Sequence, residues 1–97
     1  MSNEPAAPPS AEALEAVHEF PGPYTIKAFG SNDKAFVDAV TRTVQGNLTQ
    51  GDVTVRQRAS GKGTFTCATL TFTAENAQQV QAIYIELQAV AGLRMLL

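Results

Sequence analysis

The pattern of apolar and polar positions changes period several times after residue 23. Side chains alternate from Tyr24 to Phe29 and, over a longer stretch, from Thr64 to Ala74, and this alternation is typical of β-strands that bury one face. Shorter strands are predicted from Val53 to Arg58 and from Leu93 to Leu97. In the longest strand the even-numbered positions are the more apolar ones, so we expect them to face the core and the odd-numbered ones to face outward.

Two segments between these strands carry apolar residues at helical spacing. The first starts near Ser31 or Asn32, either of which can cap a helix, and ends at Gly46. The second starts at about Asn76 and ends at Gly92. The apolar positions are Phe36, Val37, Val40 and Val44 in the first segment, and Ala77, Val80, Ile83, Tyr84 and Leu87 in the second.

The predicted elements follow one another as strand, helix, strand, strand, helix and strand. This βαββαβ order predicts an α+β fold, the ferredoxin-like plait, in which a four-stranded antiparallel sheet carries both helices on one face. A chain of 97 residues with 44% hydrophobic residues has the size and composition of one globular domain. We therefore expect a single domain over residues 20–97.

Residues 1–19 differ from the rest of the chain in charge. They contain four Glu residues and no Lys or Arg, and three prolines lie among the first nine residues. We interpret them as an acidic leader that is disordered or partly helical. Ser10 can cap a short helix from Ala11 to His18, with Leu14 and Val17 on one side. The remainder has seven Lys and Arg against five Asp and Glu, a net charge of +2 within a chain of net charge −2.

The single cysteine and the start of the chain bear on the cellular compartment. Cys67 has no second cysteine with which to form an internal disulfide. The first five residues, Met1 to Pro5, have neither the basic stretch nor the apolar run of a secretory signal. Apolar runs are far shorter than the ~20 residues of a membrane span. We therefore expect a cytoplasmic protein that does not contact a membrane.

Several short blocks of the sequence, in a characteristic order, resemble a known family. They are Glu19-Phe20-Pro21, Tyr24-Thr25 with Lys27, Gly30, Val37-Asp38 with Val40, Lys62-Gly63, and Leu93-Arg94-Met95-Leu96-Leu97. Across residues 19–97 the chain resembles the YbeD-like family of small uncharacterised bacterial proteins. The resemblance implies the same βαββαβ fold, which is similar to the ACT-type regulatory domains that sense amino acids, and it implies no established activity.

The motifs that would mark an enzyme or a metal carrier of this topology are missing. An acylphosphatase needs an Arg in the turn after the first strand, where this chain has Gly30-Ser31-Asn32, and a metallochaperone needs a Cys-x-x-Cys motif there. We interpret His18 as a solvated residue and Cys67 as a small residue on a sheet surface, because neither has an evident chemical partner in the sequence. We expect a non-enzymatic protein with no catalytic residue, metal or cofactor.

The outer face of the predicted sheet is the main candidate for a binding surface. Four cations and three apolar side chains are expected there, namely Lys27, Arg56, Arg58, Arg94, Phe29, Phe65 and Leu96. Phe29 and Phe65 are expected to be neighbours, because the first and third strands of this topology pair antiparallel. Arg and aromatic residues are typical of interfaces, so we expect this face to bind a partner protein or a second copy of the chain. A merely solvated face is the alternative interpretation.

Two other ligands are open alternatives. Single-stranded RNA can stack its bases on aromatic rings while cations meet its phosphates. However, an RNA-recognition motif places aromatic residues at the third and fifth positions of its Lys-Gly block, whereas Phe65 is at the fourth position of the block that starts at Lys62. A small anion is the other alternative, held by the turn Gly30-Ser31-Asn32 at the start of a helix, as similarity to ACT domains implies.

Overall fold

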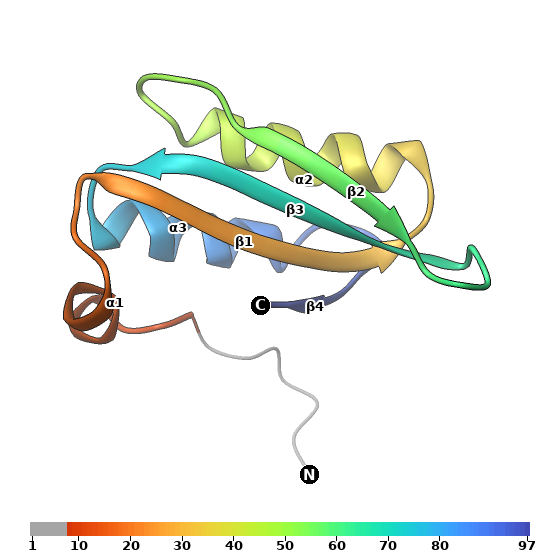
Figure 1. The fold of residues 1–97 in the computed structure, drawn as a ribbon, viewed down its shortest axis with the longest axis horizontal. Helices are drawn as coiled ribbons and strands as arrows, with labels where there is room; N and C mark the ends of the chain where they lie inside the picture. The colour runs from red at the N-terminus through yellow and green to blue at the C-terminus, as the bar shows by residue number, and fades with distance from the viewer. Residues whose placement is uncertain (1–7) are drawn as a thin grey trace, which may run out of the picture.

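Four antiparallel strands form one sheet, and two helices cover one of its faces in a computed structural model that describes residues 8–97 (Figure 1). The elements are α1 (Ala11–Val17), β1 (Gly22–Ser31), α2 (Lys34–Gly46), β2 (Thr54–Ala59), β3 (Phe65–Ala74), α3 (Ala77–Leu87) and β4 (Leu93–Leu96). The strand order is β2-β3-β1-β4. The predicted α+β class and four-stranded antiparallel sheet are confirmed, and the described chain has three helices because the short helix after Ser10 is also present.

The two long strands, β1 and β3, lie at the centre of the sheet and pair along their whole length. Gly22 lies opposite Ala74 at one end, and Ser31 lies opposite Phe65 at the other. On the far side of β3, the edge strand β2 places Arg58 opposite Cys67. Directly paired residues point to the same face of a sheet, so this register determines which side chains share the open face.

The even-numbered side chains of β1 and β3 face the helices, as the alternation predicts. The buried residues on these strands are Tyr24, Ile26, Ala28, Thr66, Ala68, Leu70, Phe72 and Ala74. Buried residues of α2 and α3 complete the core, and they are Phe36, Val40, Val44, Ala77, Val80, Ile83, Tyr84 and Leu87. Burying this apolar surface is the main stabilising contribution to the fold.

A pair of tyrosines makes a polar contact inside this core. The hydroxyl oxygens of Tyr24 on β1 and Tyr84 on α3 lie 3.2 Å apart and form a hydrogen bond. Burial raises the pKa of Tyr84, and the hydrogen bond to Tyr24 raises it further. The Tyr84 hydroxyl therefore stays protonated to higher pH than an ordinary tyrosine, and its hydrogen bond ties α3 to the sheet.

The start of α2 differs from the prediction. Its N-cap is Asp33, whose carboxylate oxygen accepts a hydrogen bond from the backbone N–H of Phe36 at 2.7 Å. The prediction of Ser31 or Asn32 as the cap is wrong, because β1 continues to Ser31, which is still paired with Phe65. The longer strand moves the start of the helix to the next residue that can cap it.

The start of α3 is as predicted, and its end is not. Asn76 caps the helix and accepts a hydrogen bond from the backbone N–H of Gln79 at 2.8 Å. The helix ends at Leu87, before Gly92. Gly92 instead has a φ of +90° in the turn that leads into β4, a conformation that favours glycine because other residues pay a steric cost there. The prediction of Gly92 as the helix terminus is therefore wrong.

The short helix α1 packs against α3. Ser10 caps it, as predicted, by accepting a hydrogen bond from the N–H of Ala13 at 3.1 Å. Leu14 is buried in the core, whereas Val17, predicted on the same side, is exposed. Helix α1, predicted within the acidic leader, is thus docked on the domain. Residues 1–7, which belong to the part of the leader predicted to be disordered, lie outside the described residues. None of the helices in residues 8–97 has the length and apolar character needed to cross a lipid bilayer.

Candidate functional site

The face of the sheet opposite α2 and α3 is open, and we call it the outer face (Figure 1). It carries the odd-numbered residues of β1 and β3 and the even-numbered residues of β2. The predicted residues Lys27, Phe29, Arg56, Arg58 and Phe65 all lie on it. None of the four described strands contains an Asp or Glu residue, so the strands bring cations and no carboxylates to this face, and Glu75 lies beyond the end of β3, where it lines a hollow with Thr73.

The strand register arranges the outer-face side chains in rows across the sheet. In one row, Lys27 of β1 and Arg56 of β2 lie on either side of Thr69 in β3. In the next row, Arg58 lies opposite Cys67. Neighbouring strands are about 4.8 Å apart, so Lys27 and Arg56 leave the sheet about 10 Å from each other. Small side chains between them leave room above the sheet.

The cations of the outer face have no anionic partner within the described residues. The ion pair found in residues 8–97 joins Lys34 to Asp38 on α2, with Nζ and Oδ2 2.9 Å apart. In the same part of the chain, Lys27, Arg56 and Arg58 make no side-chain hydrogen bond and no ion pair. Their charge is therefore available to an anionic ligand without the cost of breaking an existing pair.

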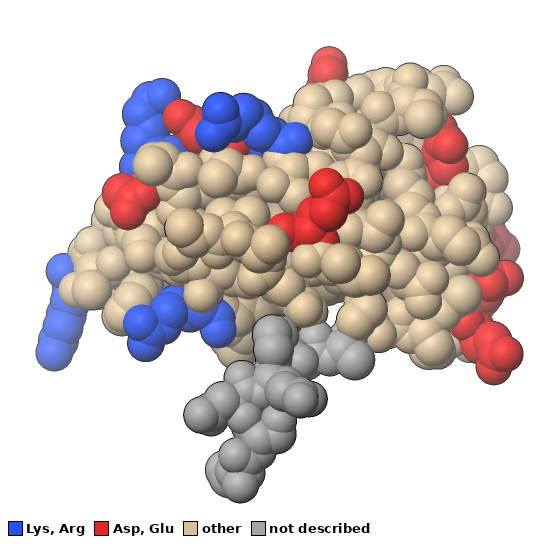
Figure 2. Space-filling view, turned by 180° about the vertical axis from the view of Figure 1, so that it is seen from behind, with Lys and Arg blue, Asp and Glu red and all other residues tan. Residues whose placement is uncertain are grey.

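Charge is distributed differently on the helix side of the molecule. Figure 2 views that side and shows Lys and Arg towards one end, while Asp and Glu occur at both ends. The carboxylates of the described chain all belong to helices, to their caps or to loops. The outer face is consequently the more basic side of a protein whose overall charge is −2.

An apolar cluster, formed by Phe29, Phe65 and Met95, lies towards β4 on the outer face. Phe65 is 39% exposed and Met95 is 48% exposed. The guanidinium carbon of Arg94 lies 5.0 Å from the centroid of the Phe65 ring, which is the geometry of a cation–π contact. Phe29, Phe65, Arg94 and Met95 line a hollow of about 230 Å³ together with Gly30.

A second hollow lies beside the apolar cluster, towards β2. Its volume is about 250 Å³, and its lining includes Phe29, Phe65, Arg58 and Cys67. Phe29 and Phe65 are diagonal neighbours, since Phe29 lies opposite Cys67 and Phe65 lies opposite Ser31. The expectation that the two rings lie near each other is confirmed, because both line each hollow.

A β-bulge in β4 places Arg94 and Met95 on the outer face. Phe29 pairs with Met95, but the next residue of β1, Gly30, pairs with Leu93. Arg94 is therefore the extra residue, and a bulge of this kind redirects the side chains beside it. Met95 shares the outer face with its partner Phe29, which places a second exposed apolar side chain near Phe65.

The prediction that Leu96 lies on the outer face is wrong. Leu96 pairs with the buried Ala28 and packs against the hydrophobic core. A prediction from strict alternation does not allow for an inserted residue. The sequence pattern therefore assigned Leu96 to the outer face and missed Met95. The four residues of β4 carry no sequence signal that distinguishes the two registers, and the pairing with β1 is what shows Met95 on the outer face.

Backbone N–H groups of the turn after β1 already donate hydrogen bonds within the protein. The N–H of Ser31 donates to the carbonyl oxygen of Gly92 at 3.1 Å, and the N–H of Asn32 donates to that of Thr64 at 3.1 Å. The next residue, Asp33, presents a carboxylate at the start of α2. The small-anion site predicted at residues 30–32 therefore lacks the free amides of Ser31 and Asn32 and has a repelling charge next to it.

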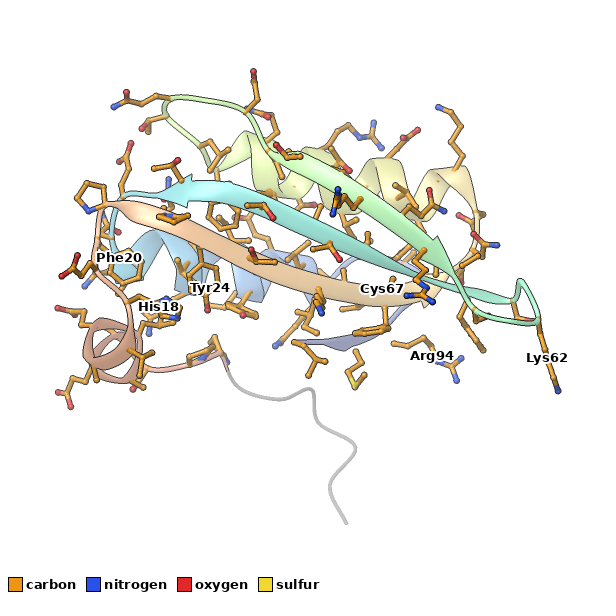
Figure 3. The ribbon with its side chains drawn as sticks, in the orientation of Figure 1. His18, Phe20, Tyr24, Lys62, Cys67 and Arg94 are labelled. Carbon is orange, nitrogen blue, oxygen red and sulfur yellow. The ribbon has the colours of Figure 1, made fainter. Side chains whose placement is uncertain are left out.

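His18 and Cys67 lie in different parts of the molecule. Figure 3 shows His18 beside Phe20 and Tyr24 near α1, and Cys67 towards the other end of the sheet. The His18 ring centroid is 4.8 Å from that of Tyr24 and 6.1 Å from that of Phe20. His18 is exposed as predicted, but it also covers part of an aromatic group. Within residues 8–97 no three His, Cys, Asp or Glu side chains are grouped closely enough to hold a metal ion.

The chain is similar to known proteins over most of its length. Residues 15–97 match the family model described as "Protein of unknown function (DUF493)". A UPF0250 protein of Pasteurella multocida is 37% identical over 84 residues, which cover 87% of this chain and 94% of the relative. UPF0250 proteins of Haemophilus ducreyi and Sodalis glossinidius are 33% and 34% identical over 87% of this chain, and the matches cover 86% and 95% of those proteins. The matches confirm the resemblance to the YbeD-like family.

Proposed function

The chain belongs to the DUF493 family of proteins of unknown function, and we propose that it is a small non-enzymatic regulatory or adaptor domain that acts through its outer face. It binds there to a protein, either a partner or a second copy of the chain. The observation that carries this proposal is the combination, on one open face, of unpaired cations and an exposed apolar cluster. Burying such a cluster against a partner supplies affinity, and the charges around it supply specificity.

The side-chain types of the outer face support binding rather than catalysis. Arg, Phe and Met are enriched in protein interfaces, and the remaining positions between the cations are Thr and Cys67. Proton transfer in enzymes is most often performed by a positioned His or carboxylate, and the outward positions of the described strands hold neither. Lys27 and Cys67, which can also transfer protons, lie in different rows of the face.

The fold itself supports a regulatory role. The βαββαβ order and the central position of β1 and β3 support assignment to the ferredoxin-like plait. ACT-type regulatory domains, to which the family's fold is similar, also have this arrangement. We place the protein in the cytoplasm, where the free thiol of Cys67 is stable because the compartment is reducing.

Single-stranded RNA is the second candidate for this face, and the cations beside an exposed ring favour it. Two features make it the weaker candidate. The Arg94 guanidinium covers one side of the Phe65 ring, on which a base would stack. The net charge of −2 also reduces the long-range attraction of phosphates.

Truncating Phe65 is expected to weaken association without unfolding the protein. Phe65→Ala removes a ring that is 39% exposed and contacts Arg94, so the free energy of unfolding should fall by about 1 kcal/mol, which leaves the protein folded. Loss of a central aromatic anchor typically weakens binding by about tenfold or more. The measurement is quantitative capture from native bacterial cytosol on immobilised wild-type and variant protein, together with sedimentation velocity of each.

The matched control is Ile85→Ala, which truncates an apolar side chain that is 57% exposed on α3, away from the outer face. It should leave both the captured proteins and the sedimentation profile unchanged. If Phe65→Ala behaves like this control in both measurements, the outer face is not the surface through which the protein acts.

A further inference from the structure

We propose that the outer face recognises an acidic segment of a different protein, which seats one apolar side chain beside Phe65 and pairs neighbouring carboxylates with Arg56 and Arg58. The inference rests on the proposed function and specifies the chemistry of the partner. It follows from three features of the face: the spacing of the arginines, the hollow next to them, and the absence of carboxylates from the described strands.

The two arginines are spaced to pair with carboxylates on an extended chain. Arg56 and Arg58 are two residues apart on β2, so their side chains leave the same face about 7 Å apart. Carboxylates at alternate positions of an extended segment have the same spacing. Both arginines line an open hollow of about 460 Å³ above Cys67 and Thr69, which leaves room for a carboxylate to meet each guanidinium side-on.

The apolar hollow adjoins the arginines. The hollow of about 250 Å³ between Phe29 and Phe65 is also lined by Arg58 and Cys67, which belong to the arginine-lined hollow as well. One ligand can therefore occupy both. The Arg94 guanidinium of β4 packs over the Phe65 ring, with its carbon 5.0 Å from the ring centroid. A leucine- or phenylalanine-sized side chain in this hollow would have a fixed aromatic wall to pack against.

Charge complementarity favours a different protein over a second copy. Two outer faces packed together would oppose four cations with four more and bring no carboxylate from the described strands. A second copy could supply carboxylates from its helices and loops only through a head-to-tail contact. Such head-to-tail contacts produce rings or open chains of molecules, not the symmetric two-fold dimer that is the commonest homo-oligomer.

The experiment selects ligands from a phage-displayed library of short random peptides on the immobilised 97-residue chain. Selection on the wild type is expected to enrich peptides that combine several Asp or Glu residues with one large apolar residue. The same selection on the double variant Arg56→Gln and Arg58→Gln should lose this enrichment. The control variant, Lys34→Gln with Arg42→Gln, removes two charges from α2 and should retain it.

Affinities of one enriched synthetic peptide then test each part of the site. We expect the arginine double variant to bind about five- to tenfold more weakly, which corresponds to two exposed charge pairs. Phe65→Ala should weaken binding by about tenfold. Raising the salt concentration should weaken binding by the wild type more than binding by the arginine double variant, which keeps Lys27 and Arg94.

Three outcomes would overturn the inference. The first is a selection that enriches neutral or basic peptides, or that enriches no peptide at all. The second is tighter binding of oligouridine than of the acidic peptide. The third is self-association of the free protein that the Phe65→Ala substitution abolishes. If acidic peptides fail while Phe65→Ala still removes proteins captured from cytosol, the partner chemistry is wrong and the proposed function stands. If neither peptide binding nor the capture of cytosolic proteins depends on the outer face, the inferred partner chemistry and the proposed function are both wrong.

Discussion

Replacing Leu70 with Asp is expected to unfold the protein. Leu70 lies at the centre of β3, is 0% exposed, and belongs to the hydrophobic core between the sheet and the helices. The substitution removes a buried side chain, at a cost of about 2–5 kcal/mol, and places an unpaired carboxylate in an apolar environment at further cost. Total stability for a domain of this size is roughly 5–15 kcal/mol. Circular dichroism and thermal denaturation would measure the loss.

The adjacent residue provides a matched control for this substitution. Thr69 is next to Leu70 on the same strand but points to the outer face, between Lys27 and Arg56. Thr69→Asp should therefore fold normally, since its carboxylate lies at the surface near two cations. The assignment of the two faces of the sheet would be reversed if Thr69→Asp unfolded the protein and Leu70→Asp did not.

Adding a methyl group at Gly30 is expected to destabilise the protein by about 1–3 kcal/mol, the usual cost of overpacking. A Cβ atom at this position would lie 2.4 Å from the ring of Phe36 and 2.6 Å from the carbonyl oxygen of Gly92. The Phe36 ring is buried and the second contact is backbone, so neither can move away freely. Gly30→Ala should lower the melting temperature by several degrees for each kcal/mol lost.

The same substitution at Gly61 is the control for Gly30. A Cβ atom at Gly61 would meet no atom within 4 Å, so Gly61→Ala should melt within a few degrees of the wild type. Equal melting temperatures for Gly30→Ala and the wild type would mean that Phe36 does not pack on β1 as described.

Period-two alternation predicted the strands and the orientation of β3 because Leu70 and Phe72 on one side contrast with Thr69 and Thr71 on the other. This contrast depends only on local sequence, and a one-residue slip would bury the threonines. The outward positions of Lys27, Arg56 and Arg58 followed from the same kind of alternation in the first and second strands. These features could therefore be predicted without coordinates.

Features that depend on contacts distant in sequence could not be predicted. The bulge at Arg94 arises from the pairing of β4 with β1, and a four-residue strand is too short to reveal an insertion by its pattern. The cap of α2 depends on how far β1 stays paired with β3, which moved it to Asp33. The burial of Leu14 depends on α1 docking against α3. In each case tertiary contacts decided between locally acceptable alternatives.

Chemical-shift mapping of the isotope-labelled protein, titrated with an acidic peptide selected on it, tests most directly whether the outer face is the binding surface. We expect the largest changes at Lys27, Phe29, Arg58, Phe65 and Met95, with Ile85 on α3 unaffected. Saturable changes concentrated on the exposed sides of α2 and α3, with β1 and β3 unchanged, would contradict it.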